Sequence, residues 1–397
     1  MSKQLDIRQK LVYNIVMSKE SYKFNLRPTT AQETLLEKTL ELCRWTYNET
    51  LATRKNSWEL EQKSVGFYQT KRLLPLWKIT KPELSDVHSQ VLQNVHERVE
   101  LAFRAFFQRV KKGDKPGYPR FKGFGCYGSF TFPQYGNGGA TLKDDGLHLS
   151  KVGVVEITLH REIPVDAKIK RVTIKREGHQ WFAIFSVEIP EHQKGKCGQG
   201  AVGIDLGCKT FAVLSDGNKI ENPKFLEKAL KKISKAQRKL AKQSKGTPER
   251  TRAKKVIGKV YRKVNNQRAN FLHQESRKLV NKYETLIFED LNVKQMVEQR
   301  PWHSLNRTIL DAAWDKFVFC CSYKAENAGG KVIKVNPKNT TKMCSRCGEI
   351  VDKDLSERIH LCPICGLKID RDWNSSINIL RRGQSSLVKS NLVLEAL

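Results

Sequence analysis

Four cysteines in the last quarter of the chain have the spacing of a metal site. Cys344 and Cys347 form one C-x2-C pair, and Cys362 and Cys365 form a second pair after fourteen intervening residues. Four thiolates at this spacing can close a tetrahedral shell around one Zn²⁺. Because that shell leaves no open coordination position for a substrate, we expect the zinc to be structural.

Acidic residues at three distant places could do the chemistry that such a zinc cannot. Asp205 interrupts an apolar segment, Glu289 follows another, and Asp372 lies shortly after the last cysteine. Cleavage of a phosphodiester by two divalent cations requires carboxylates that hold both ions, one activating water and the other stabilising the leaving oxygen. We therefore predict that Asp205, Glu289 and Asp372 are catalytic and bind Mg²⁺ or Mn²⁺.

Each acid also has a simpler interpretation when it is taken alone. A lone carboxylate at the end of a strand is more often a turn or cap residue, and Asp372 could merely cap the helix that follows it. Asp290 and Asp370 are neighbouring acids that could contribute instead of Glu289 and Asp372.

The charge of the chain limits its partners. Its 397 residues carry a formal net charge of +31, which favours a polyanion, with nucleic acid first and an anionic membrane second. The membrane is disfavoured because the sequence contains no run of about 18 apolar residues and no signal-peptide pattern. The other six cysteines form no paired framework, so we expect a reducing, cytoplasmic location.

The first half of the sequence alternates between strand and helix patterns. Helical spacing predicts a helix that opens with a capping box at Thr30–Glu33 and a second helix over Val91–Phe107. Period-two and apolar runs predict strands at 22–28, 129–132, 154–159, 171–175 and 181–189. Short strands at this spacing favour a small barrel or sandwich into which the helices are inserted.

The second half, after a linker at 195–200, predicts an RNase H-like sheet. Its strands are expected at 202–207, 211–214, 285–288 and 332–335, with a hairpin turn at 215–218. The basic segment 228–282, broken near Gly246-Thr247-Pro248, is expected to form a helical hairpin, and a loose tail follows Arg382. Acids for intrahelical pairing are scarce in this hairpin, so we predict phosphate contacts there, with candidates Lys231, Lys232, Lys235, Arg238, Lys239, Lys255, Lys259 and Arg262.

These motifs together resemble the TnpB family, which bacterial and archaeal insertion sequences carry. The resemblance rests on Gly203-Ile204-Asp205-Leu206-Gly207, on Phe288-Glu289-Asp290-Leu291, on the four cysteines and on Asp370–Ile379. Motifs of the first half agree with it, at 23–28, 44–48, 117–122 and 129–132. One departure is Asn374-Ser375-Ser376, where the family commonly has Asn-Ala-Ala.

The resemblance implies an RNA-guided DNA endonuclease. A guide RNA from the transposon end would supply sequence specificity, and the protein would read a short motif in the double-stranded DNA target. It also implies that Asp205, Glu289 and Asp372 are the metal-binding acids, with Asp372 preferred because Asp-x-Asn is shared with larger RuvC-type effectors. Nucleic-acid contacts carried by the family's motifs are expected at Gln93, Tyr118, Arg120 and Lys122.

The implied architecture is multidomain α+β, with one copy expected per guide RNA. A wedge-like β-barrel would comprise 1–28 and 124–194, and a helical recognition domain would comprise 29–123. A RuvC-like nuclease domain would comprise 195–342 and 367–382, with the zinc finger at 343–366 and a tail at 383–397.

Two other classes of function remain open. A non-cleaving RNA-guided DNA binder would be expected to lose the acids, which this chain keeps. A transposase with RNase H-like acids fits the cysteine finger and the basic hairpin less well. A small type V CRISPR effector is a near neighbour of the favoured class.

Overall fold

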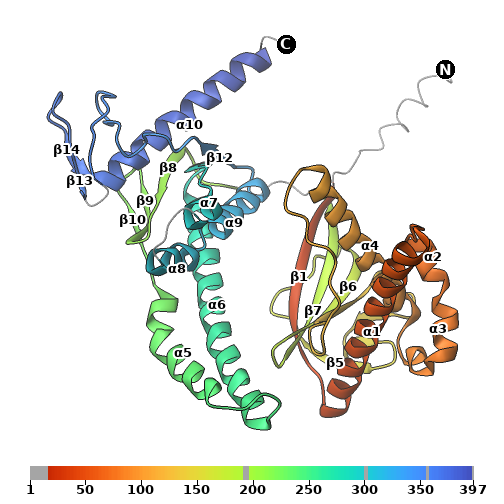
Figure 1. The fold of residues 1–397 in the computed structure, drawn as a ribbon. Helices are drawn as coiled ribbons and strands as arrows, with labels where there is room; N and C mark the ends of the chain where they lie inside the picture. The colour runs from red at the N-terminus through yellow and green to blue at the C-terminus, as the bar shows by residue number, and fades with distance from the viewer. Residues whose placement is uncertain (1–16, 191–195, 299–302, 355–356, 396–397) are drawn as a thin grey trace, which may run out of the picture. The chain divides into compact units, whose positions relative to one another are not determined.

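The chain folds as two units, residues 1–192 and 193–397 (Figure 1). The computed structural model describes residues 17–190, 196–298, 303–354 and 357–395. Gly195 of the expected linker and the start of the expected wedge domain, residues 1–16, lie outside these ranges. No helix within them is both long and apolar enough to cross a membrane.

The first unit is built on one antiparallel sheet of seven strands. In spatial order the strands are β2 (Ser129–Phe132), β6 (Lys168–Glu177), β7 (Gln180–Pro190), β1 (Met17–Arg27), β5 (Gly153–Thr158), β4 (Gly146–Leu149) and β3 (Ala140–Lys143). The five expected strands are present, and β1 does join strands that follow the helices, since it pairs with β5 and β7.

The sheet is a half-barrel, where the sequence had suggested a small barrel or sandwich. β2 and β3 are its two edges, and no ladder between described strands joins them. β3 and β4 were not predicted from the sequence; they are four residues each, and β3 follows a glycine-rich turn at 136–139. Strands this short carry too few alternating residues to stand out as a pattern.

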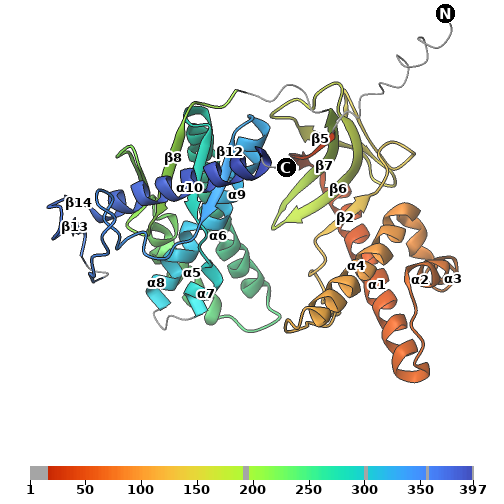
Figure 2. The ribbon, with the colours of Figure 1, turned by 90° about the horizontal axis from the view of Figure 1, so that it is seen from above.

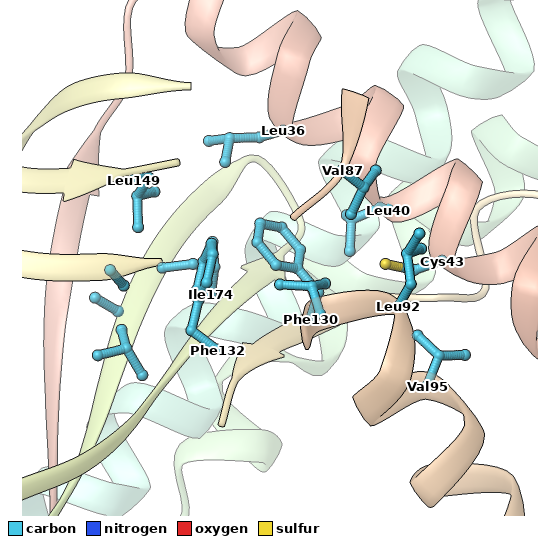
Figure 3. Packing of buried hydrophobic residues seen from close by; sticks show 14 of the residues in the cluster. Leu36, Leu40, Cys43, Val87, Leu92, Val95, Phe130, Phe132, Leu149 and Ile174 are labelled. Carbon is cyan, nitrogen blue, oxygen red and sulfur yellow. The ribbon is translucent and has the colours of Figure 1, made fainter. Parts of the chain in front are cut away.

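The helices between β1 and β2 pack on this sheet. They are α1 (Thr30–Glu61), α2 (Phe67–Arg72), α3 (Leu74–Thr80), a 3-10 turn (Pro82–Asp86) and α4 (Ser89–Lys111). Figure 3 shows the shared core, in which Leu36 and Leu40 of α1 and Leu92 and Val95 of α4 meet Phe130 of β2.

The capping box of α1 lies one residue earlier than the sequence analysis placed it. The Thr29 hydroxyl accepts the Gln32 amide at 3.3 Å, and Gln32 Oε1 accepts the Thr29 amide at 3.0 Å. Both Thr29-x-x-Gln32 and Thr30-x-x-Glu33 fit the motif. Thr29 takes the cap because the chain is still extended there, at φ −64° and ψ 163°.

The second unit contains a mixed sheet of five strands. Their spatial order is β10 (Lys219–Glu221), β9 (Thr210–Leu214), β8 (Ala201–Leu206), β11 (Thr285–Glu289) and β12 (Lys331–Val335). The first three pair antiparallel, which confirms the expected hairpin, and β8, β11 and β12 run parallel.

Helices cover both faces of this sheet. Between β10 and β11 lie α5 (Phe225–Ala241) and α6 (Pro248–Lys282), so the expected helical hairpin is confirmed. α7 (Val293–Glu298), α8 (His303–Ala312) and α9 (Trp314–Asn327) follow β11. Side chains of α6 and α9 share one core with Ile204 of β8 and Phe288 of β11.

The opposite face of the sheet carries α10 (Arg371–Glu395), which follows a two-stranded ribbon of β13 (Ile359–Leu361) and β14 (Lys368–Asp370). Figure 2 shows α10 running across β8 and β12. The expected loose tail is wrong for residues 383–395, because the helix continues through them. A Cβ on Gly383 would lie 2.4 Å from Ile287 Cδ1, so the glycine allows α10 to stay against β11.

Candidate functional site

Asp205 and Glu289 project from the same face of neighbouring parallel strands. The register of β8 and β11 pairs Ile204 with Phe288, and each acid follows immediately after that pair. Successive strand residues point to opposite faces. Since Ile204 and Phe288 belong to the core under α6 and α9, both acids face the side of the sheet that α10 covers.

Two glycine contacts bring α10 close to this face. A Cβ on Gly203 would lie 2.1 Å from the Ser376 carbonyl oxygen and 2.5 Å from the Leu380 amide nitrogen. Gly203 shares its strand face with Asp205. The absent side chain therefore lets the helix backbone rest on β8, with Asp372 at its N-terminal end.

The structure separates the roles of Asp370 and Asp372. Asp370 Oδ1 accepts the Asp372 amide at 3.0 Å and the Trp373 amide at 3.1 Å, so Asp370 is the residue that caps α10. Its Oδ2 also lies 3.2 Å from Lys219 Nζ. Asp372 is free of capping and is held by Arg371, whose Nη2 lies 3.0 Å from its Oδ1.

Asp290, the other alternative, points away from the acids. It is exposed and its Oδ1 lies 3.2 Å from Lys334 Nζ. Glu289 is half-buried, and the Thr340 hydroxyl donates a hydrogen bond to its Oε1.

The surroundings of Asp205 and Glu289 raise the pKa of both carboxyls. Burial raises the pKa of Asp205 well above its ordinary value, and the charges of Glu289, Asp372 and Asp370 raise it further, while Arg371 opposes them. Burial also raises the pKa of Glu289, against the Thr340 hydrogen bond and the charge of Arg382. Carboxylates crowded in this way lower their energy by binding a cation or a proton.

Within the described residues, the atoms of three or more potential ligands converge to within 4.8 Å only at the four cysteines. The carboxylates of Asp205, Glu289 and Asp372 interact without forming so tight a group. Asp372 in particular is turned toward Arg371 and Arg358, whose Nη1 lies 3.7 Å from its Oδ2.

The four cysteines fit a tetrahedral zinc site. Cys344 Sγ lies 3.6 Å from Cys365 Sγ, and Cys347 Sγ lies 3.5 Å from Cys362 Sγ. Bonds of about 2.3 Å to a tetrahedral zinc place sulfur atoms about 3.8 Å apart. Each C-x-x-C pair is followed by a glycine with positive φ, Gly348 at +84° and Gly366 at +69°, which closes the turn.

Further residues bind the loop before the first cysteine pair and were missed by the sequence analysis. Thr340 contacts Glu289, and Asn374, Asn378 and Arg382 of α10 donate hydrogen bonds to the carbonyls of residues 336–343. The available signal was the recurrence of Asn374, Asn378 and Arg382 at every fourth position, which places them on one side of the helix.

The basic candidates line α5 and α6. Lys231, Lys235, Arg238 and Lys239 line a hollow of about 850 Å³ on one face of α5, together with Leu230, Ser234 and Lys242. Lys232 is exposed beside them, Lys255 and Lys259 are exposed on α6, and Arg262 is half-buried. Ile233 is buried on the opposite side of α5, so the charged face is turned to solvent.

The candidates of the first unit do not form one site. Gln93 lines a hollow of about 640 Å³ with Tyr68, Lys71, Arg72, Leu74, Pro75, Lys78 and Ser89. The backbone of Lys122 is held by Asn48 and Arg44, and its Nζ lies 5.6 Å from the centre of the Tyr47 ring. Tyr118 packs edge-on against Phe103 and Phe106, whereas Arg120 is exposed.

Comparison with known proteins agrees with this architecture. A family model described as "Probable transposase" matches residues 184–300, a "Cas12f1-like, TNB domain" matches 314–379, and a "Helix-turn-helix domain" matches 17–63. In this chain the residues that match the helix-turn-helix model, 17–63, form the strand β1 followed by the single long helix α1.

Relatives are similar over most of the chain. A protein of Streptomyces pristinaespiralis named "Putative RNA-guided DNA endonuclease" is 31% identical over 340 residues, covering 84% of this chain and 82% of its own length. The InsQ protein of Escherichia coli, with the same description, is 28% identical and covers 94% of each chain. A TnpB-like protein of Acanthamoeba polyphaga mimivirus is 28% identical over 47% of this chain.

The fold of the chain is similar to that of Cas12f1. The structure of a Cas12f1–sgRNA–target DNA complex superposes with a TM-score of 0.56 at 12% identity, covering 91% of this chain and 98% of that one. By sequence, the chain belongs to the TnpB family.

Proposed function

We propose that this chain is a transposon-encoded, RNA-guided DNA endonuclease. Its relatives bear that name, and the observation that carries the proposal is the placement of Asp205 and Glu289 on the sheet face that α10 covers, with Asp372 in the first turn of that helix. These acids come from three elements that are far apart in sequence. A structural role for any one of them would not require the other two beside it.

The second unit is proposed to be a RuvC-like nuclease domain. A three-stranded antiparallel meander followed by two parallel strands, with helices on both faces, supports an RNase H-like fold. The half-barrel and the helices α1 to α4 would then be the wedge and recognition domains. One protein copy would bind one guide RNA.

Asp205, Glu289 and Asp372 would hold two divalent cations, Mg²⁺ or Mn²⁺. Carboxylate oxygens are the ligands that these ions prefer. The chemistry supplied by the ions is activation of water and stabilisation of the leaving oxygen.

The residues of the chain prepare this site. Burial and the neighbouring acids raise the pKa of Asp205, so a cation would compete with a proton there, and Asp372 would exchange its contact with Arg371 for the cation. A hollow of about 360 Å³ opens beside Glu289 on the α9 side of the sheet, lined by Trp314, Ser322 and Lys334 among others, and neither Asp205 nor Asp372 lines it. The α5 lysines would hold a nucleic-acid backbone through its phosphates.

The test begins with the bound RNA. The protein is expressed with its native flanking DNA, purified in high salt, and the RNA that remains bound is sequenced. We expect one discrete species with a constant scaffold and a variable 3′ end. The reconstituted complex should then cut a plasmid library only beside one short motif. Absent or heterogeneous RNA, or cleavage that ignores the guide, would contradict the proposal.

A further inference from the structure

One face of α10 carries a polar seam of three residues spaced four apart, Asn374, Asn378 and Arg382. Residues four apart lie on the same side of a helix. Asn374 and Asn378 are fully buried. They lie on a helix whose Ile379 joins the core beneath β8 and β11, so polar groups here need partners inside the protein.

All three residues of the seam bind the loop 336–345, which leads from β12 to the first cysteine pair. Arg382 Nη1 donates to the carbonyls of Asn336 at 2.7 Å and Lys338 at 2.6 Å. Asn378 Nδ2 donates to the carbonyls of Thr340 at 2.9 Å and Met343 at 2.6 Å.

Asn374 completes the seam at its end nearest to Asp372. Its Nδ2 donates to the Met343 carbonyl at 2.8 Å, and its Oδ1 accepts the Ser345 amide at 2.8 Å. The amide therefore uses both of its polar atoms on the loop. Successive turns of α10 are thus fastened along the loop 336–345 up to the residue after Cys344.

The same loop presents Thr340 to Glu289. Thr340 is 1% exposed, its carbonyl is bound by Asn378, and its hydroxyl donates to Glu289 Oε1. The hydroxyl also lies 3.0 Å from the Pro337 carbonyl. Because a hydroxyl has one proton, an ionised Glu289 is the stronger acceptor of the two.

We infer that Thr340 and the seam form a positioning bridge, which fixes Glu289 of β11 relative to Asp372 of α10. Asp372 lies two residues before Asn374 on the same helix, and Glu289 is reached through Thr340. The inference rests on the proposed function, since it assigns these residues to the alignment of that site. The cysteine module then has a second role, because it anchors the far end of the loop.

Thr340→Val is the decisive variant, because valine keeps the shape and the backbone carbonyl that Asn378 binds while removing the hydroxyl. Thr340→Ser keeps the hydroxyl and is its matched control. At saturating guide and target, we expect Thr340→Val to cleave about 10- to 100-fold more slowly. The half-saturating Mn²⁺ concentration should rise, and Thr340→Ser should restore both values.

A readout independent of activity is the binding of Mn²⁺ to the guide-bound protein. This binding is measured as the loss of the EPR signal of free Mn²⁺. Thr340→Val should weaken this binding while the affinity for target DNA stays unchanged. Asn378→Ala is the second variant. It leaves the Thr340 hydroxyl in place but releases the loop, and it should likewise slow cleavage without weakening target binding.

Glu289→Ala in the same assays distinguishes failure of the positioning bridge from failure of the proposed catalytic site. If it is inactive while Thr340→Val cleaves and binds Mn²⁺ like the wild type, the bridge is wrong and the proposed function stands. If Glu289→Ala cleaves normally, the proposed site itself is wrong. Loss of melting temperature and target binding by both Thr340 variants would mean that the residue is only structural, which also overturns the inference.

Discussion

Gly203 of β8 lies directly beneath the carbonyl of Ser376 in α10, where even a single Cβ would come within 2.1 Å of the oxygen. The contact is between two backbones, so no side-chain rotation can relieve it. It lies two residues before Asp205 and four residues after Asp372, and it therefore sets how closely these acids approach.

Gly203→Ala should push α10 away from the sheet. We expect a loss of about 1–3 kcal/mol or more in the free energy of unfolding, as for other overpacked sites, and loss of cleavage. Gly258→Ala is the matched control, because Gly258 lies within α6 with no atom within 4 Å of its added Cβ. That control should be neutral or stabilising by up to about 1 kcal/mol. Equal effects in denaturant unfolding would contradict the packing argument.

Asp205→Ala should abolish cleavage and leave guide RNA binding unchanged, because the acid faces the proposed cation site and not the basic hairpin. Asp370→Asn is the informative comparison, since Asp370 caps α10 and an asparagine can also cap a helix. We expect it to retain most of the activity. Gel assays of guided plasmid cleavage measure both, and an inactive Asp370→Asn with normal stability would reopen the choice between the two aspartates.

Without bound cations, the crowded carboxylates should make the wild type less stable at neutral pH than the variant Asp205→Asn. The pKa of Asp205 is raised on folding, so its ionisation costs stability above the folded pKa, and that cost vanishes below the unfolded value of about 3.9. Asp205→Asn should therefore raise Tm at pH 7 by about 2–4 °C for each kcal/mol relieved.

Calorimetry in the absence of divalent ions measures this difference, which should shrink as the pH falls toward 4. Added Mn²⁺ should stabilise the wild type and have little effect on the variant. A pH-independent difference in Tm would show that the substitution acts through packing instead of through charge.

Removal of zinc should unfold the cysteine module and loosen the loop 336–345. Cys344→Ser is expected to lose bound zinc and to lower Tm, because metal binding free energy is folding free energy in such modules. Cys126→Ser, at an exposed cysteine outside the cluster, is the control and should change neither. Zinc content by mass spectrometry and melting curves measure the two effects. A zinc-free Cys344→Ser with unchanged Tm would refute a structural metal.

Contacts between α5 and phosphates should be visible in the dependence of binding on salt. Lys235→Ala should weaken nucleic-acid binding and reduce the slope of log K against log salt by about 0.7–0.9, the value for one contact. Lys342→Ala removes the same charge from a lysine that lies 2.6 Å from Asp352 and is the control. Equal slopes for the two variants would mean that the α5 face does not bind the backbone.

Local patterns in the sequence determined much of this architecture. Two C-x-x-C turns present their sulfurs to a common point whatever surrounds them, so the cysteine cluster could be predicted from spacing alone. The helical hairpin followed from a glycine, a threonine cap and a proline between two periodic segments, and the five expected strands of the first unit followed from alternation.

Only the tertiary structure decided which acids meet. Glu289 ends β11 on the face that α10 covers, whereas Asp290, the next residue, pairs with Lys334, and only the packing of α10 distinguishes these two acids. Asp370 and Asp372 are distinguished by which carboxylate accepts the free amides of α10. The contact of Thr340 with Glu289 joins residues 51 positions apart. Such pairings depend on how separate elements pack, and no local pattern of residues encodes that.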